Sequence, residues 1–243
     1  MKTYQIHLIR NGLTDGNIAG QYIGQTDIPL SPDGVLQIKQ IQEDMVYPYA
    51  EAVFSSPMVR CTQTAHAIYG KDPIVIENLK EYDFGEFEGK TAEQLQDYEE
   101  FSAWLSGGPD AAPPYGESNA EFSKRIFECF IQIVNGLIKT GTTQSAIVTH
   151  GGVIMALLSA FGIPEAPMHE WRTPNACGYT VRITPSIWSK LQKMEVIAEI
   201  PEPARGNRDE DIDNYDDLSD FDDDSLYNEA FFVDVEEIDE KLN

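Results

Sequence analysis

Short apolar segments alternate with longer amphipathic segments along the first 200 residues of this chain of 243 residues. The short segments have the length and composition of buried strands, and the longer ones repeat apolar residues at helical spacing. Strands are expected at residues 4–9, 52–55, 74–76, 145–149, 178–183 and 194–200. Helices are expected at residues 37–45, 58–69, 118–138 and 153–161. This alternation predicts a three-layer α/β/α fold with a mostly parallel sheet.

Charge divides the chain into two regions. Residues 1–200 carry 24 acidic and 14 basic side chains, whereas residues 201–243 carry 17 acidic and 3 basic ones. A turn-rich segment from Pro201 to Asn207 marks the change in composition, so we place a domain boundary there. We expect one domain over residues 1–200 and an acidic C-terminal extension over residues 201–243. The formal net charge of −24 argues against nucleic acid as a partner, because nucleic-acid binding requires a basic surface.

The acidic extension has two halves of different character. Like charges dominate the first half, which predicts disorder. In the second half Phe231, Val235, Ile238 and Leu242 recur at helical spacing, which predicts a short helix that packs onto the main domain or binds a protein partner. A solvated tail that only improves solubility is the alternative. The segment that starts at Asp209 imitates a calcium loop, but it lacks the Gly and Glu required at the sixth and twelfth positions.

The same sequence gives no reason to expect a membrane span, a signal peptide or a metal site. No apolar stretch reaches 18 residues, and a strand is expected almost directly after Met1. The three cysteines, Cys61, Cys129 and Cys177, lie far apart and have no metal-ligand spacing. They favour a reducing cytoplasm as the location, with each thiol buried as a small apolar group.

Two arginines that follow predicted strands are candidates for binding an anion. Arg10 comes directly after the strand at residues 4–9, and Arg60 lies in the first turn of the helix after the strand at residues 52–55. Ligands of α/β proteins usually bind where parallel strands end, so both side chains are expected at one edge of the sheet. A guanidinium group is a permanently charged, bidentate donor, so this pair suits a phosphate group.

Four sequence blocks occur in an order that resembles the histidine phosphatase superfamily, the phosphoglycerate-mutase-like enzymes. They are Leu8-Ile9-Arg10-Asn11-Gly12-Leu13-Thr14 with Asn17, the stretch from Ser55 to Ala65, Glu81 with Gly85-Glu86-Phe87-Glu88-Gly89, and Thr149-His150-Gly151-Gly152. Further agreement lies at residues 27–31 and 116–118. Each block is weak alone, but the ordered set is specific and covers roughly residues 4–185.

The resemblance implies a role for each matched residue. The phosphate group would be bound by Arg10, Asn17, Arg60 and Gly151. His150 would take part in catalysis beside them, and Glu81 would protonate the leaving group. A bound phosphate dianion would favour the protonated form of Glu81. The implied substrate is a small phosphate monoester, with no metal or other cofactor; phosphosugars, phosphoserine-like acids, nucleotides and cobamide-precursor phosphates remain alternatives.

Asn11 departs from the family pattern, in which the residue after the first arginine is the histidine nucleophile. An amide hydrogen-bonds to phosphate, but it has no basic nitrogen and forms no stable phospho-intermediate. The chain is therefore expected to bind phosphate without turnover, whereas a parent with His at position 11 would hydrolyse a monoester through a phosphohistidine. Two origins remain open: a deliberate replacement, which the intact Arg60, Glu81 and His150 favour, or a natural pseudoenzyme that senses a phosphorylated ligand.

The segment between Glu81 and Glu117 bears on the choice between phosphatase and mutase. Phosphoglycerate mutases carry a long insertion with extra basic residues there, but here the two residues are 36 positions apart and Lys90 is the only basic residue between them. This favours a phosphatase over a phosphoglycerate-type mutase. The segment is rich in aromatic residues, namely Tyr98, Phe101, Trp104 and Tyr115. These either line a lidded, partly apolar substrate pocket or form the core of a helical cap.

Overall fold

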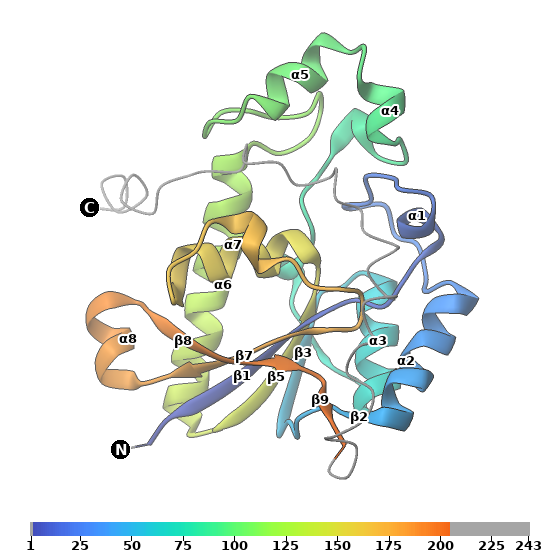
Figure 1. Ribbon diagram of the computed structural model, residues 1–243. Coiled ribbons are helices and arrows are strands. Elements are labelled where there is room, and N and C mark those ends of the chain that lie inside the picture. Colours follow the sequence, from blue (N-terminus) through green and yellow to red (C-terminus); the bar gives the residue numbers. More distant parts are fainter. Residues whose placement is uncertain (1, 205–243) are drawn as a thin grey trace.

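The computed structural model describes residues 2–204 and contains a seven-stranded sheet with helices on both faces (Figure 1). The order of the strands in the sheet is β4-β3-β5-β1-β7-β8-β6. Their bounds are β1 Tyr4–Arg10, β3 Ala52–Ser55, β4 Ile74–Val75, β5 Gln144–Thr149, β6 Gly162–Ile163, β7 Gly178–Ile183 and β8 Met194–Ile200. Within this sheet only β7 runs antiparallel to its neighbours, so the expected mostly parallel α/β fold is confirmed.

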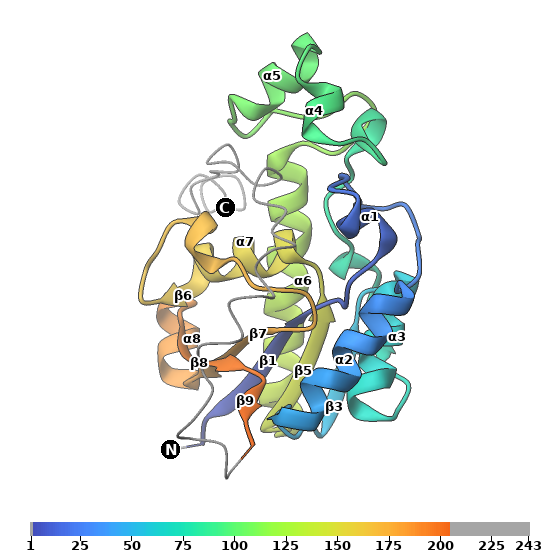
Figure 2. The same cartoon turned by 45° about the vertical axis from the view of Figure 1, so that its right-hand side comes forward.

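The longer helices cover the two faces of the sheet in pairs, α2 with α3 and α6 with α7 (Figures 1 and 2). The α-helices are α1 Asp15–Ile18, α2 Pro32–Asp44, α3 Val59–Tyr69, α4 Ala92–Leu95, α5 Glu99–Leu105, α6 Asn119–Thr140, α7 Gly151–Phe161 and α8 Pro185–Leu191. Three short 3-10 helices are η1 Glu77–Leu79, η2 Gly85–Phe87 and η3 Met168–Trp171. Within residues 2–204, no helix is both long and apolar enough to cross a membrane.

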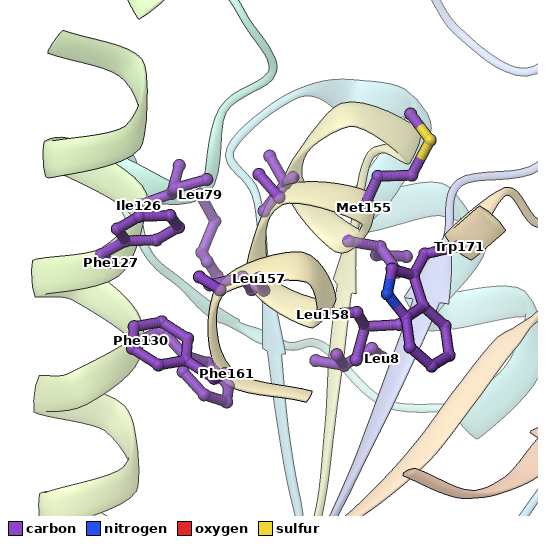
Figure 3. Close-up of a cluster of buried hydrophobic side chains, with 14 of the residues drawn as sticks. Leu8, Leu79, Ile126, Phe127, Phe130, Met155, Leu157, Leu158, Phe161 and Trp171 are labelled. Atoms are coloured by element: carbon purple, nitrogen blue, oxygen red, sulfur yellow. The ribbon is translucent and has the colours of Figure 1, made fainter. Parts of the chain in front are cut away.

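The central strand β1 is buried on both faces because its side chains alternate between two cores. Ile6 and Leu8 belong to the large core beneath α6 and α7, whereas Ile9 belongs to the smaller core beneath α3. Figure 3 shows the large core, where Phe127 and Phe130 of α6 face Phe161 of α7. The ring centroids of Phe127 and Phe161 are 5.1 Å apart and those of Phe130 and Phe161 are 6.0 Å apart.

Of the shortest elements the sequence predicted only the strand β4, which was expected at residues 74–76. Strands of two residues, such as β6, β2 Met45–Val46 and β9 Glu202–Pro203, carry no readable period. Helix α1 has four residues and depends on a capping box between Thr14 and Asn17, a local interaction that periodicity does not reveal. Helices α4, α5 and α8 also escaped prediction because they span two turns or fewer.

The predicted acidic extension lies almost wholly outside the described residues. The chain beyond Ile200 first forms β9, which pairs with β2 in a separate two-stranded sheet. The expected disorder of residues 209–225 and the expected helix around residues 231–242 concern residues that the structure does not describe. The division into residues 1–200 and 201–243 therefore stays a prediction.

Phe130→Ala should lower the free energy of unfolding by about 3–5 kcal/mol, because it leaves a cavity between α6 and α7. Phe130 is fully buried and contacts the rings of both Phe161 and Trp188. The matched control is Glu128→Ala on the exposed side of the same helix, which should change stability by less than about 0.5 kcal/mol. Urea unfolding followed by circular dichroism measures both; equal losses would show that α6 does not anchor the core.

Candidate active site

A polar cavity opens where the parallel strands β1, β3 and β5 end. The register aligns Arg10 with Thr149 and Ser55 with Val148, so the loops that follow the three strands leave the sheet side by side. The cavity is lined by Arg10, Asn11, Thr14, Asn17, Gln21, Ile23, Arg60, Glu81, Phe84, His150 and Gly151. The structure thus brings all seven residues that the sequence singled out to one place, the carboxyl edge of the sheet that such folds use for ligands.

Both arginines of the cavity are oriented by backbone carbonyl groups. Arg60, which is 2% exposed, donates from Nη1 to Thr26 O at 2.9 Å and from Nη2 to Gly24 O at 2.5 Å. Arg10 donates from Nη1 to Thr173 O at 2.8 Å. Carbonyl oxygens fix a guanidinium group without cancelling its charge, so the remaining N–H donors are available to an anion in the cavity.

Two asparagines lie beside these cations. Asn11 is buried, and its Nδ2 group donates to Gly12 O at 2.9 Å. Asn17 is the N3 residue of the α1 capping box, and its Oδ1 accepts from Thr14 Oγ1 at 2.9 Å and from Asn175 Nδ2 at 3.4 Å. Because its oxygen is engaged on the protein side, the Nδ2 group of Asn17 is the end that can donate to a phosphate oxygen.

Glu81 is buried against the first turn of α7. Its Oε2 accepts from Gly152 N at 2.9 Å and its Oε1 accepts from Tyr82 N at 2.9 Å. A Cβ atom at position 152 would lie 2.5 Å from Glu81 Oε1, so only glycine allows this approach. Since Gly151 and Gly152 begin α7, the positive end of the helix dipole also points at this part of the cavity.

Arg125 and Glu117 fix the segment that carries Glu81. Arg125 donates to the carbonyl oxygens of Lys80, at 3.0 Å, and of Glu81, at 3.3 Å, and forms an ion pair with Glu117 at 2.5 Å. Glu117 also accepts from Asp83 N at 3.0 Å. The Gly116-Glu117-Ser118 block, to which the sequence assigned no role, therefore contributes by holding the loop around Glu81.

His150 is buried between Ser56 and Cys61. Its Nε2 lies 2.8 Å from Ser56 Oγ and 3.5 Å from Cys61 Sγ. Burial, and then the positive charges of Arg60, Arg125 and Arg10, hold the pKa of His150 well below 6.5, so the ring is neutral at pH 7 in the absence of an anion. Burial raises the pKa of Cys61 to about 12, so this cysteine stays a thiol.

Several residues at the site were not singled out by sequence reasoning. Thr14 and Ser56 lie inside the motif blocks named in the sequence, so the motifs could have indicated them. Gln21, Ile23 and Phe84 line the cavity from segments without a recognisable motif. Thr64, which accepts from Gly12 N, also lies inside a motif block, whereas the supporting residues Arg125 and Asn175 gave no local signal because they reach the site from distant parts of the chain.

The aromatic residues of the α4–α5 region belong to a packed cap. Phe101 and Trp104 are buried among Tyr22, Tyr82, Phe84 and Phe87. Tyr98 and Tyr115 are 46% and 90% exposed. None of the four aromatic residues named from the sequence lines the cavity. The cap-core interpretation therefore holds for Phe101 and Trp104, and only Phe84 belongs to both the cap core and the cavity.

Residues 2–204 contain no group of three or more His, Cys, Asp or Glu side chains that could hold a metal ion. All three cysteines are free; Cys61 and Cys129 are buried and Cys177 is half-buried. Their burial agrees with the expectation that they serve as small apolar groups.

Inorganic phosphate should raise the pKa of His150, because a nearby anion favours the protonated ring. Without phosphate, the ring should stay neutral as the pH falls through 6.5. The unfolded chain binds this proton near pH 6.5 whereas the folded chain does not, so stability in phosphate-free buffer should fall below that pH. NMR of the imidazole nitrogens measures the pKa; a value near 6.5 that phosphate does not change would contradict the geometry.

Comparison with known proteins agrees with this arrangement. A model of the histidine phosphatase superfamily (branch 1) matches residues 6–195. An adenosylcobalamin/alpha-ribazole phosphatase of Salmonella typhimurium is 28% identical over 185 residues, covering 74% of this chain and 90% of that protein. A Proteus mirabilis protein named "Probable phosphoglycerate mutase GpmB" is 31% identical over 192 residues, covering 76% and 87%. The crystal structure of the alpha-ribazole phosphatase from Shigella flexneri matches with a TM-score of 0.65 at 26% identity, covering 83% and 96%. The chain belongs to branch 1 of the histidine phosphatase superfamily.

Proposed function

We propose that this chain is a phosphatase-family protein that binds small phosphate monoesters and lacks the nucleophile needed to hydrolyse them. The observation that carries the proposal is one cavity in which two arginines, a buried carboxyl group and a buried imidazole surround Asn11. Asn11 occupies the position at which the resemblance places the nucleophilic histidine. A parent with His at that position would be a phosphoric monoester hydrolase.

The cavity supplies the groups that this reaction needs. In the parent, an imidazole nitrogen would attack phosphorus while the ester P–O bond breaks, and Glu81 would give its proton to the leaving oxygen. Arg10, Arg60 and His150 would stabilise the negative charge on the non-bridging oxygens. Water would then cleave the phosphohistidine, with Glu81 accepting a proton. With Asn11, the binding groups remain but the first step has no nucleophile.

The charges around the cavity support a phosphatase more than a mutase, although the names of the relatives include both. Arg10 and Arg60 are the only basic side chains other than His150 among the residues that line the cavity. A phosphoglycerate-type mutase must also bind a substrate carboxylate and a second phosphate group. Here the lining also includes Gln21, Ile23 and Phe84, which suit an uncharged or apolar leaving group.

A pseudoenzyme that senses a phosphorylated ligand is the second candidate, and Asn11 itself is the observation that favours it. In that case the acidic extension, residues 201–243, would dock a protein partner when the ligand binds. The free cysteines favour a reducing compartment, such as the cytoplasm, for either function.

Asn11→His should convert the chain into an active phosphatase, because every other group of the proposed mechanism is already in place. We expect the unaltered chain to give no turnover of p-nitrophenyl phosphate above background and the variant to give at least about a hundredfold more. The matched control is Asn11→Gln, which keeps an amide and should stay inactive. Equal activity of the unaltered chain and the Asn11→His variant would refute the phosphohistidine mechanism. If Asn11→His hydrolyses none of a broad panel of monoesters, the sensor function is favoured.

Glu81→Gln, introduced into the Asn11→His background, should lower the rate of hydrolysis of alkyl phosphates more than that of p-nitrophenyl phosphate. An alkoxide is a poor leaving group that needs a proton, whereas nitrophenolate leaves readily without one. Steady-state kcat values for the two substrates test this difference. Equal losses for both substrates would mean that Glu81 positions the substrate and does not protonate the leaving group.

A further inference from the structure

The carboxylate of Glu88 binds a row of backbone N–H groups in the loop of residues 24–26. Gly24 N donates to both carboxylate oxygens at 3.1 Å, Gln25 N to Oε1 at 2.8 Å and Thr26 N to Oε2 at 3.3 Å. Phe84 N is a fourth N–H donor, to Oε1 at 3.3 Å. Successive N–H groups that converge in this way form an anion-binding nest, which here is occupied by a side chain of the protein.

The other side of the same loop holds Arg60. The carbonyl oxygens of Gly24 and Thr26 are the acceptors for the two terminal nitrogens of its guanidinium group. The loop of residues 24–26 therefore connects Glu88, which does not line the cavity, with Arg60, which does.

The connection passes through a single peptide group. Gly24 C=O and Gln25 N–H belong to the same planar trans peptide, so they point in opposite directions, one to Arg60 and one to Glu88. Hydrogen bonds in such a chain polarise one another, because a carboxylate at the N–H end makes the carbonyl a stronger acceptor. The backbone at this point is closely packed, since a Cβ atom on Gly24 would lie 1.8 Å from Tyr82 O.

We propose that Glu88 is a positioning residue for Arg60 and that it sets phosphate affinity through the peptide between Gly24 and Gln25. This inference rests on the proposed function, because it concerns the cation that would bind the phosphoryl group. Without the carboxylate, four N–H groups, three of them in the loop, lose their shared acceptor and the two carbonyls are no longer fixed. Arg60 then has to be ordered by the ligand itself, which weakens binding.

Glu88→Gln is the test variant, because it keeps the size of the side chain but removes the charge and turns one acceptor into a donor. Glu86→Gln is the matched control, since Glu86 lies in the same Gly85–Gly89 block with an exposed side chain. The affinity for inorganic phosphate is measured by NMR titration of the full chain, which also follows weak binding. We expect Glu88→Gln to weaken phosphate binding about tenfold, or about 1.4 kcal/mol, and Glu86→Gln to leave it unchanged.

A double-mutant cycle shows whether the effect passes through Arg60. In the Arg60→Ala background, Glu88→Gln should cause less than about a twofold further loss, whereas in the Arg10→Ala background it should still cost the full tenfold. An equal loss in both backgrounds, or no loss in the otherwise unaltered chain, would overturn the proposal. If Arg60→Ala alone leaves phosphate affinity unchanged, the proposed function fails instead.

A fold defect is separated from a positioning effect by a second variant. Glu88→Asp keeps the charge with a shorter reach, so it should bind phosphate with an affinity between those of the unaltered chain and Glu88→Gln. If Glu88→Gln does not fold, the cycle is carried out with Glu88→Asp, and the same dependence on Arg60 is expected. A Glu88→Asp chain that is folded and binds phosphate independently of Arg60 would refute the inference.

Discussion

The site depends on a buried guanidinium group whose positive charge is held by backbone carbonyls. Burying a cation is costly unless its N–H groups are satisfied, and Arg60 achieves this with two carbonyl oxygens from the loop at residues 24–26. Carboxylate partners would satisfy the same donors but would also repel a phosphate dianion. The negative charge that stabilises the loop is instead placed on its far side, at Glu88, where it orients the cation without lining the cavity.

Arg10 and Glu81 are also held by hydrogen bonds to other segments of the chain. Arg10 is held by a carbonyl of the segment before β7, and Glu81 by the first turn of α7 and by the Arg125–Glu117 pair. Arg10, Arg60 and Glu81 are thus each held by hydrogen bonds to the protein. Under the proposed function, such preorganisation would let the cavity bind an anion although the residue at position 11 lacks a basic nitrogen.

The sequence predicted the parts of the molecule that local patterns encode. The long helices and the strands of four or more residues have clear periods, and the ordered motif blocks identified Arg10, Arg60, Glu81 and His150. The supporting contacts were not predicted because they join residues that are distant in sequence. Arg125 and Glu81 are 44 positions apart, and Glu88 and Gln25 are 63 positions apart. The aromatic residues of the cap were ambiguous, since burial and ligand contact favour the same side chains.

Under the proposed function, Asn11 lets this chain separate binding from chemistry, because the site would hold its ligand without consuming it. The most direct test of the account is a crystal structure of the unaltered chain grown with tungstate, a phosphate mimic whose position anomalous scattering reveals. We expect one tungstate in the cavity, hydrogen-bonded to Arg10 and Arg60 with His150 beside it. An empty cavity at saturating tungstate, or tungstate bound only elsewhere on the protein, would contradict the proposed phosphate site.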